Sequence, residues 1–216
     1  MRSTHLPNSP RELVLIGGAY KSGTSRLCEI LEAGGYVNPA ALTNPMEHGH
    51  GIRVRLYQTR ECSIARQFNR ELLAAGSCEQ IRIERNLGGY LADMWEMMGD
   101  RLVVKDPCMK LTAPHWFRVA RSLGTTRIVF LHTEREPHEI LRSWANSQFL
   151  TREQRLNPER FSRLLAPIAP TISEQLLGLE VTTTAIPYSH IAHAGSAVPL
   201  QQFANNLLSN RLARAS

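Results

Sequence analysis

The sequence predicts an α/β domain built on a central parallel sheet. Three short apolar runs, 13–16, 102–104 and 127–132, are separated by segments with helical periodicity. Runs without polar alternation are typical of strands buried on both faces of a parallel sheet. Parallel strands need long crossovers, and helices in those crossovers cover the faces of the sheet. We therefore expect a three-layer α/β/α arrangement with ligands at the carboxyl ends of the strands.

Length and composition favour one domain over 1–216, with 1–11 as a loose N-terminal lead-in. Hydrophobic residues make up 43% and charged residues 20% of the chain, which is ordinary for a globular protein. The net charge of +6 fits a polyanionic ligand. No basic run carries interleaved aromatic residues, so we expect no nucleic-acid partner.

Neither a membrane span nor a secretory leader is expected, because no stretch is long and apolar enough. The four cysteines show no C-x-x-C spacing. They are interpreted as reduced, mostly buried thiols of a cytoplasmic protein.

The remaining elements follow from periodicity and from Gly and Pro positions. A short strand is predicted at 36–37 and another strand at 181–186. Pro114 is interpreted as the start of a helix that Gly124 stops. The first predicted helix follows Ser25 and runs to about Ala33. The other predicted helices cover 56–75, 83–98, 136–149, 158–177 (interrupted by prolines) and 200–208.

The stretch 17–25 is the first candidate site. Two glycines end the first strand, and Lys21-Ser22-Gly23-Thr24-Ser25 leads into a helix. A glycine-bearing loop before a helix aims backbone N–H groups and the positive end of the helix dipole at one point, which suits a phosphate. Lys21 adds a full charge, while Thr24 and Ser25 can cap the helix and donate to phosphate oxygens.

The order of residues in this loop differs from the nucleoside-triphosphate version G-x-x-x-x-G-K-[ST]. Here the lysine comes two residues before Gly23, and Thr24-Ser25 follows the glycine directly. This order resembles the 5′-phosphosulfate loop of sulfotransferases that use 3′-phosphoadenosine 5′-phosphosulfate (PAPS). The resemblance implies a P-loop-like sulfotransferase fold. It assigns Lys21, Ser22, Gly23, Thr24, Ser25 and Arg26 to the 5′-phosphosulfate.

A second stretch strengthens the resemblance. Arg135 lies just after a buried strand, and Ser143 follows eight residues later on the next helix. Sulfotransferases place an arginine and a serine at this spacing around the 3′-phosphate of the nucleotide. Arginine suits a phosphate monoester because its planar fork is always charged. Taken separately, Arg135 could be an ordinary surface arginine and Ser143 an ordinary serine on a helix face, without a role in binding.

The strand 102–104 runs into Lys105-Asp106-Pro107, which resembles the K-[ST]-P or K-D-P element of glycan-type and bacterial sulfotransferases. In that family the lysine lies near the sulfuryl group or the acceptor. A cation there could neutralise charge on the equatorial oxygens. Cys108 occupies the place where relatives often have an arginine, so acceptor contacts are expected to differ.

The general base is a choice among Glu47, His48, His50 and Asp106, in that order. The resemblance implies a glutamate in the loop that holds Glu47, whereas histidine titrates near neutral pH. His48 and His50 also form a His-x-His pair, but no third metal ligand has suitable spacing. The resemblance implies no metal.

The last third of the chain matches the family least. Pro187-Tyr188-Ser189-His190 resembles a degenerate Y-E-D-L element, in which the tyrosine packs near adenine. A core tyrosine is the alternative for Tyr188. The late R-K-G element of some cytosolic members is absent from the sequence.

The predicted activity is transfer of a sulfuryl group from PAPS to a hydroxyl or amine, with release of adenosine 3′,5′-bisphosphate. The acceptor is expected to be a small molecule or a glycan, and the sequence specifies neither it nor the oligomeric state. Two alternatives stay open: a P-loop kinase or NTPase, and a nucleotide-binding protein without catalysis. The kinase alternative is disfavoured by the lysine position and by strands that do not end in an aspartate placed for Mg²⁺.

Overall fold

The computed structural model describes residues 10–19, 21–40, 60–145, 170–194 and 199–209. Its centre is a four-stranded sheet of order β2-β1-β3-β4, and every pairing in it is parallel. This confirms the α/β class with a parallel sheet. The strands are β1 (Glu12–Gly18), β2 (Arg101–Lys105), β3 (Arg127–Glu134) and β4 (Thr182–Pro187).

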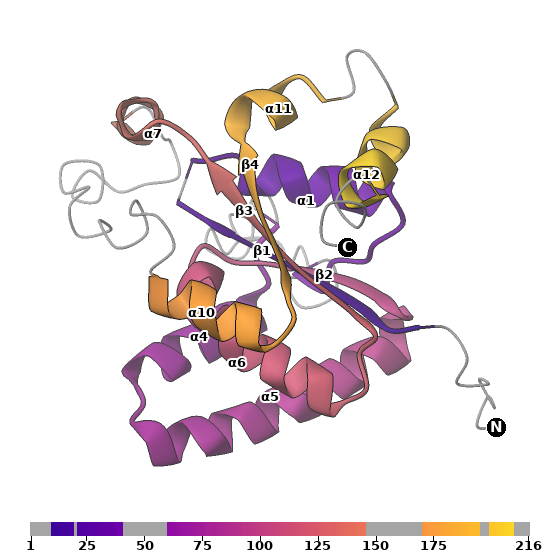
Figure 1. Ribbon diagram of the computed structural model, residues 1–216, viewed down its shortest axis with the longest axis vertical. Coiled ribbons are helices and arrows are strands. Elements are labelled where there is room, and N and C mark those ends of the chain that lie inside the picture. The colour runs from indigo at the N-terminus through magenta and orange to yellow at the C-terminus, as the bar shows by residue number, and fades with distance from the viewer. Residues whose placement is uncertain (1–9, 20, 41–59, 146–169, 195–198, 210–216) are drawn as a thin grey trace, which may run out of the picture.

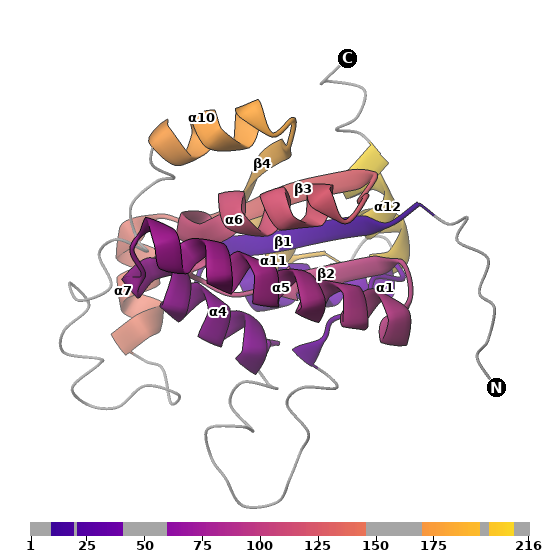
Figure 2. The same cartoon turned by 90° about the horizontal axis from the view of Figure 1, so that it is seen from below.

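Helices cover both faces of the sheet, as Figures 1 and 2 show from two directions. One face carries α1 (Thr24–Ala33), α11 (Tyr188–Ala192) and α12 (Leu200–Ser209). The other carries α4 (Ser63–Ala74), α5 (Ser77–Met98), α6 (Met109–Ser122) and α10 (Pro170–Gly178). The remaining helix, α7 (Pro137–Ala145), lies beyond the carboxyl end of β3. The three layers predicted from the sequence are therefore present.

Alternate residues of each strand enter two different cores. Leu13 and Leu15 of β1 pack with α4, α5 and α6, whereas Val14 and Ile16 pack with α1, α11 and α12. All four side chains are at most 1% exposed. Side chains of a strand point alternately to opposite faces of a sheet, so burial on both faces requires an apolar residue at every position. That requirement explains the unbroken apolar runs.

The candidate residues converge because parallel strands end at the same edge of the sheet. In the strand register Ile16 pairs with Lys105, Gly18 pairs with Thr133, and Glu134 pairs with Pro187. The residues that follow each strand, including Arg135 and Tyr188, therefore lie at one carboxyl edge. This is the edge at which ligands bind in open α/β sheets.

The helix expected to start at Pro114 begins instead at Met109. The side chain of Asp106 explains the difference, because its Oδ1 accepts the backbone N–H of Cys108 at 2.8 Å. The backbone carbonyl of Asp106 also accepts the N–H of Met109 at 3.0 Å. An aspartate that turns the chain in this way initiates the helix before the proline.

Other boundaries also differ from expectation. The helix predicted at 83–98 begins at Ser77, and Val37 forms a single bridge with Leu102 in place of a strand. The predicted helices 56–75, 136–149 and 158–177 are described only in part, as α4, α7 and α10. Among the helices described, none combines the length and apolar character needed to cross a bilayer.

Candidate active site

The loop between β1 and α1 has a left-handed backbone at two positions. Lys21 has φ of 67° and Gly23 has φ of 96°. A Cβ on Gly23 would lie 2.7 Å from the ring of Tyr188 and 2.7 Å from Ile191, so both conformation and space require glycine. A non-glycine residue in the left-handed region costs free energy, and such residues cluster at ligand-binding positions.

Gly23 is the N-cap residue of α1, whereas Thr24 and Ser25 were expected to cap it. The left-handed turn explains this, because the chain enters the helix directly from Gly23. Glycine offers no side chain to the first N–H groups of the helix, and these groups have no partner within the helix. The start of α1 therefore presents backbone donors, which suits an anion in front of the loop.

Ser22 shapes the loop from inside. Its buried hydroxyl donates to the carbonyl of Ala19 at 2.6 Å and lies 2.5 Å from Oγ1 of Thr133 on β3. The N–H of Ser22 also donates to the carbonyl of Ala19, at 3.2 Å. The residue predicted to bind phosphosulfate therefore ties the loop to β3 through its side chain.

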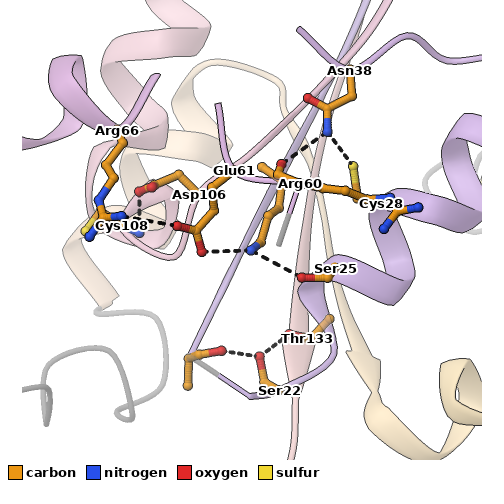
Figure 3. Close-up of polar contacts among 12 residues, drawn as sticks. Ser22, Ser25, Cys28, Asn38, Arg60, Glu61, Arg66, Asp106, Cys108 and Thr133 are labelled. Carbon is orange, nitrogen blue, oxygen red and sulfur yellow. Dashed lines mark hydrogen bonds and ion pairs between the residues drawn. The ribbon is translucent and has the colours of Figure 1, made fainter. Parts of the chain in front are cut away.

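Lys105 meets this loop from β2. Its ammonium lies 3.0 Å from Oε1 of Glu61 and 3.5 Å from Oγ of Ser25, in the first turn of α1. The two contacts converge in Figure 3. Burial lowers the pKa of Lys21, and the positive charge of Lys105 lowers it further. Lys21 and Lys105 thus bring two cationic side chains to the same loop.

Asp106, the residue after Lys105, is buried close to Glu61. Its Oδ1 accepts a hydrogen bond from Nδ2 of Asn69 at 2.9 Å, in addition to the bond from Cys108. Asn69 in turn accepts from Thr112 and Trp116 of α6. Burial raises the pKa of Asp106, and the neighbouring charge of Glu61 raises it further. At 1% exposure, Asp106 supports the start of α6 and offers little access to an acceptor.

Arg135 connects the end of β3 to the β1–α1 loop. Its Nη1 donates to the carbonyl of Lys21 at 2.8 Å, and its Nε donates to Glu139 at 3.3 Å. The guanidinium lies 4.1 Å from the ring centroid of Tyr188. Arg135, the predicted 3′-phosphate arginine, therefore contacts both the predicted adenine tyrosine and the backbone of the loop lysine.

A cavity of about 840 Å³ opens at this edge and includes Arg135 and Tyr188 in its wall. Its wall also contains Lys110 and His132, which the sequence did not single out. Burial lowers the pKa of Lys110 to about 8. Burial also lowers the pKa of His132, an effect that Lys110 reinforces and Glu134 opposes. The rarity of lysine could have drawn attention to Lys110, because the chain has only two others, Lys21 and Lys105, and both are predicted site residues.

Other predicted residues are not gathered at this point. Arg26 bonds Glu29 at 2.6 Å and the carbonyl of Ala194 at 2.5 Å, so it ties α1 to the segment after α11. Ser143 is half-buried on α7 and is not among the described residues that line the cavity. The base candidates Glu47, His48 and His50 lie outside the described residues.

Glu61 is a further residue of this region that the sequence analysis did not identify. It is 3% exposed and is separated from Lys105 by 44 positions. No local pattern pairs two residues at that separation, because only the fold brings the chain before α4 to the end of β2.

Comparisons with known proteins show similarity at the level of structure and not of sequence. No protein-family model matches the chain, and no curated protein matches it. Among solved structures, it is similar to a sulfotransferase domain from the curacin biosynthetic pathway, with 16% identity and a TM-score of 0.46. That alignment covers 95% of this chain and 74% of the other. At this level of similarity, functional assignment rests on the residues of the chain itself.

Proposed function

We propose that this protein transfers a sulfuryl group from PAPS to a hydroxyl or amine and releases adenosine 3′,5′-bisphosphate. The observation that carries the proposal is the meeting of Lys21 and Lys105 at the β1–α1 loop, with Ser25 3.5 Å from the Lys105 ammonium. Two cations at one loop suit a group whose negative charge is spread over several oxygens.

In this proposal the backbone donors of 23–25 and the Lys21 ammonium bind the 5′-phosphosulfate. Lys105 faces the equatorial oxygens of the sulfuryl group. Arg135 and Tyr188 line the cavity for the 3′-phosphoadenosine part. Arginine can hold a phosphate by its planar fork, and an aromatic ring can stack on a base.

The reaction forms a bond from the acceptor oxygen or nitrogen to sulfur and breaks the bond from sulfur to the bridging oxygen. The acceptor proton passes to a general base, for which Glu47 is the first candidate and His48 and His50 are the others. The electron pair of the broken bond stays on the bridging oxygen, near which we place Lys21. Positioning and charge neutralisation supply most of the catalysis in transfers of this type.

Thermal unfolding in the presence of nucleotides tests the proposal. A ligand that binds only the folded state raises the melting temperature. Adenosine 3′,5′-bisphosphate should raise it several degrees, and AMP, which lacks the 3′-phosphate, should raise it much less. A shift with ATP that requires Mg²⁺, and none with the bisphosphate, would replace the proposal with a P-loop kinase. Stabilisation by the bisphosphate without any turnover of PAPS would indicate a nucleotide-binding protein without catalysis.

A further inference from the structure

A buried ion pair joins the chain just before α4 to the end of β2. The Lys105 ammonium lies 3.0 Å from the Glu61 carboxylate, and the two side chains are only 3% and 4% exposed. Taking a charge out of water is unfavourable unless a partner compensates it, and loss of one partner leaves an uncompensated buried charge. Glu61 therefore makes it possible for an ammonium to lie at this position.

The pair faces the phosphate loop. The same ammonium that contacts Glu61 is 3.5 Å from Ser25 Oγ, and its charge reaches Lys21 strongly enough to depress the pKa of that lysine. Before an anion binds, Lys21 and Lys105 repel each other. The carboxylate of Glu61, 3.0 Å from the Lys105 ammonium, is a negative charge that offsets this repulsion.

A second cation also contacts the Glu61 carboxylate. Nη1 of Arg66, on α4, lies 3.6 Å from Oε2 of Glu61, whereas Nζ of Lys105 lies 3.0 Å from its Oε1. The buried Asp106 is close enough for the charge of Glu61 to affect it. Among the described residues, the other charged or titratable groups around the pair are Arg66, Asp106 and Lys21, together with the thiols of Cys28 near Lys105 and Cys108 near Glu61.

Lysine is used sparingly in this chain. The chain has three lysines, and every other Lys or Arg position is an arginine. The lysines are Lys21 after β1, Lys105 at the end of β2 and Lys110 shortly after β2. A lysine carries a compact charge on a flexible stem, so it can move between two anions more easily than a planar guanidinium can. The ion pair with Glu61 is a contact of this adjustable kind.

We infer that Glu61 is a positioning residue for sulfuryl transfer: its carboxylate holds the Lys105 ammonium beside Ser25 before the nucleotide binds, and then shares it with the sulfuryl donor. The inference rests on the proposed function. It implies opposite effects on binding and on rate. Glu61 competes with the anionic ligand for Lys105, which weakens binding, and it fixes the direction from which Lys105 approaches the transferring group.

Glu61→Gln tests the two effects because it keeps the shape of the side chain and removes its charge. Calorimetry should show binding of adenosine 3′,5′-bisphosphate that is unchanged or up to about tenfold tighter. Single-turnover breakdown of PAPS, with water or 4-nitrophenol as acceptor, should slow by about tenfold or more. The matched control is Glu84→Gln, which removes a carboxylate paired with His115 and Arg118 away from the site. It should leave both measurements unchanged.

A double-mutant cycle with Lys105→Met shows whether Glu61 acts through Lys105. If it does, Glu61→Gln should slow the wild-type chain but have no further effect on PAPS breakdown in the Lys105→Met background. In urea unfolding, the double variant should be more stable than Lys105→Met alone, because the latter leaves Glu61 without its buried counter-ion. Rate losses that multiply would overturn the inference.

The small number of lysines allows a readout that needs no turnover. With ¹⁵N-labelled lysine, the Lys105 ammonium should give a proton–nitrogen signal protected from solvent exchange in the wild type. Glu61→Gln should remove that protection and leave the Lys110 signal in place. Wild-type protein that binds no bisphosphate overturns the proposed function and the inference together. Binding of the bisphosphate with an unchanged Lys105 signal and rate in Glu61→Gln overturns the inference alone.

Discussion

The guanidinium of Arg135 donates a hydrogen bond to the backbone carbonyl of Lys21 at 2.8 Å. The carbonyl belongs to a lysine in the left-handed region, with φ of 67°. The end of β3 thus supports the least favourable backbone conformation of the phosphate loop. A residue predicted for the 3′-phosphate and a residue predicted for the 5′-phosphosulfate are thus joined by a hydrogen bond.

Arg135→Ala should therefore affect nucleotide selection and loop geometry together. The difference in melting shift between adenosine 3′,5′-bisphosphate and AMP should disappear, because the group proposed to read the 3′-phosphate is gone. Arg135→Lys should restore only part of the difference, since an ammonium lacks the planar fork. Arg142→Ala, at an exposed position of α7, is the control and should keep the difference. Preserved discrimination in Arg135→Ala would remove Arg135 from the 3′-phosphate site.

Lys21→Ala should slow chemistry more than it weakens binding. Under the proposed function, charge grows on the bridging oxygen as the bond to sulfur breaks, so Lys21 should interact more strongly with the transition state than with bound PAPS. We expect a loss of about 10²-fold in kcat, comparable to removal of one oxyanion donor. Single-turnover PAPS breakdown beside calorimetric bisphosphate binding measures the two effects. If binding is lost and the bound fraction reacts at the wild-type rate, Lys21 is an anchor only.

Glu47→Gln should retain bisphosphate binding and lose turnover by about 10²-fold, as expected for a general base. A carboxylate base loses activity as the pH falls through its own pKa, so the wild-type rate should decline on the acid side. His48→Ala and His50→Ala are the comparison variants. Full activity in Glu47→Gln, with a loss in either histidine variant, would assign the proton transfer to that histidine.

Asp106→Asn and Asp106→Ala should differ in stability. Asparagine keeps an oxygen that can accept from Cys108 and Asn69, whereas alanine leaves both donors without this acceptor. Each buried donor without a partner costs about 1–3 kcal/mol. Urea unfolding at neutral pH should therefore rank Asp106→Asn above Asp106→Ala. Equal stabilities would show that the Asp106 side chain does not hold the start of α6.

Lys110 should give the protein a stability that rises with pH. Burial lowers its pKa from 10.5 to about 8 in the folded chain, so between these values the unfolded chain binds more protons. The free energy of unfolding therefore increases through that window. Urea unfolding at the two ends of the window should show an increase on the order of 1 kcal/mol that Lys110→Met lacks. A parallel pH dependence in wild type and Lys110→Met would contradict the burial of a charged Lys110.

The sequence predicted what depends on strand patterns and on local motifs. The run 13–16 identified β1 because burial on both faces leaves an unbroken apolar signal. The motif at 21–25 identified the loop because its lysine, glycine and hydroxyl residues lie within five consecutive positions. The pairing of Glu61 with Lys105 depends on the fold bringing the chain just before α4 to the end of β2, which no local signal encodes. The start of α6 was missed because a side chain, that of Asp106, replaced the proline as the initiating signal.

The last two described helices, α11 and α12, pack against the first helix and the loop before it. Gly34 at the end of α1 approaches α12 so closely that an added Cβ would lie 2.6 Å from that of Ala204, and Tyr188 of α11 contacts Gly23. During synthesis, the strands β1, β2 and β3 emerge before the residues that cover α1 and close the loop. A nascent chain that ends near 180 would carry every lysine and Arg135 but lack the tyrosine that packs on the loop glycine. Under the proposed function, nucleotide binding should therefore be acquired only after α11 and α12 have been made.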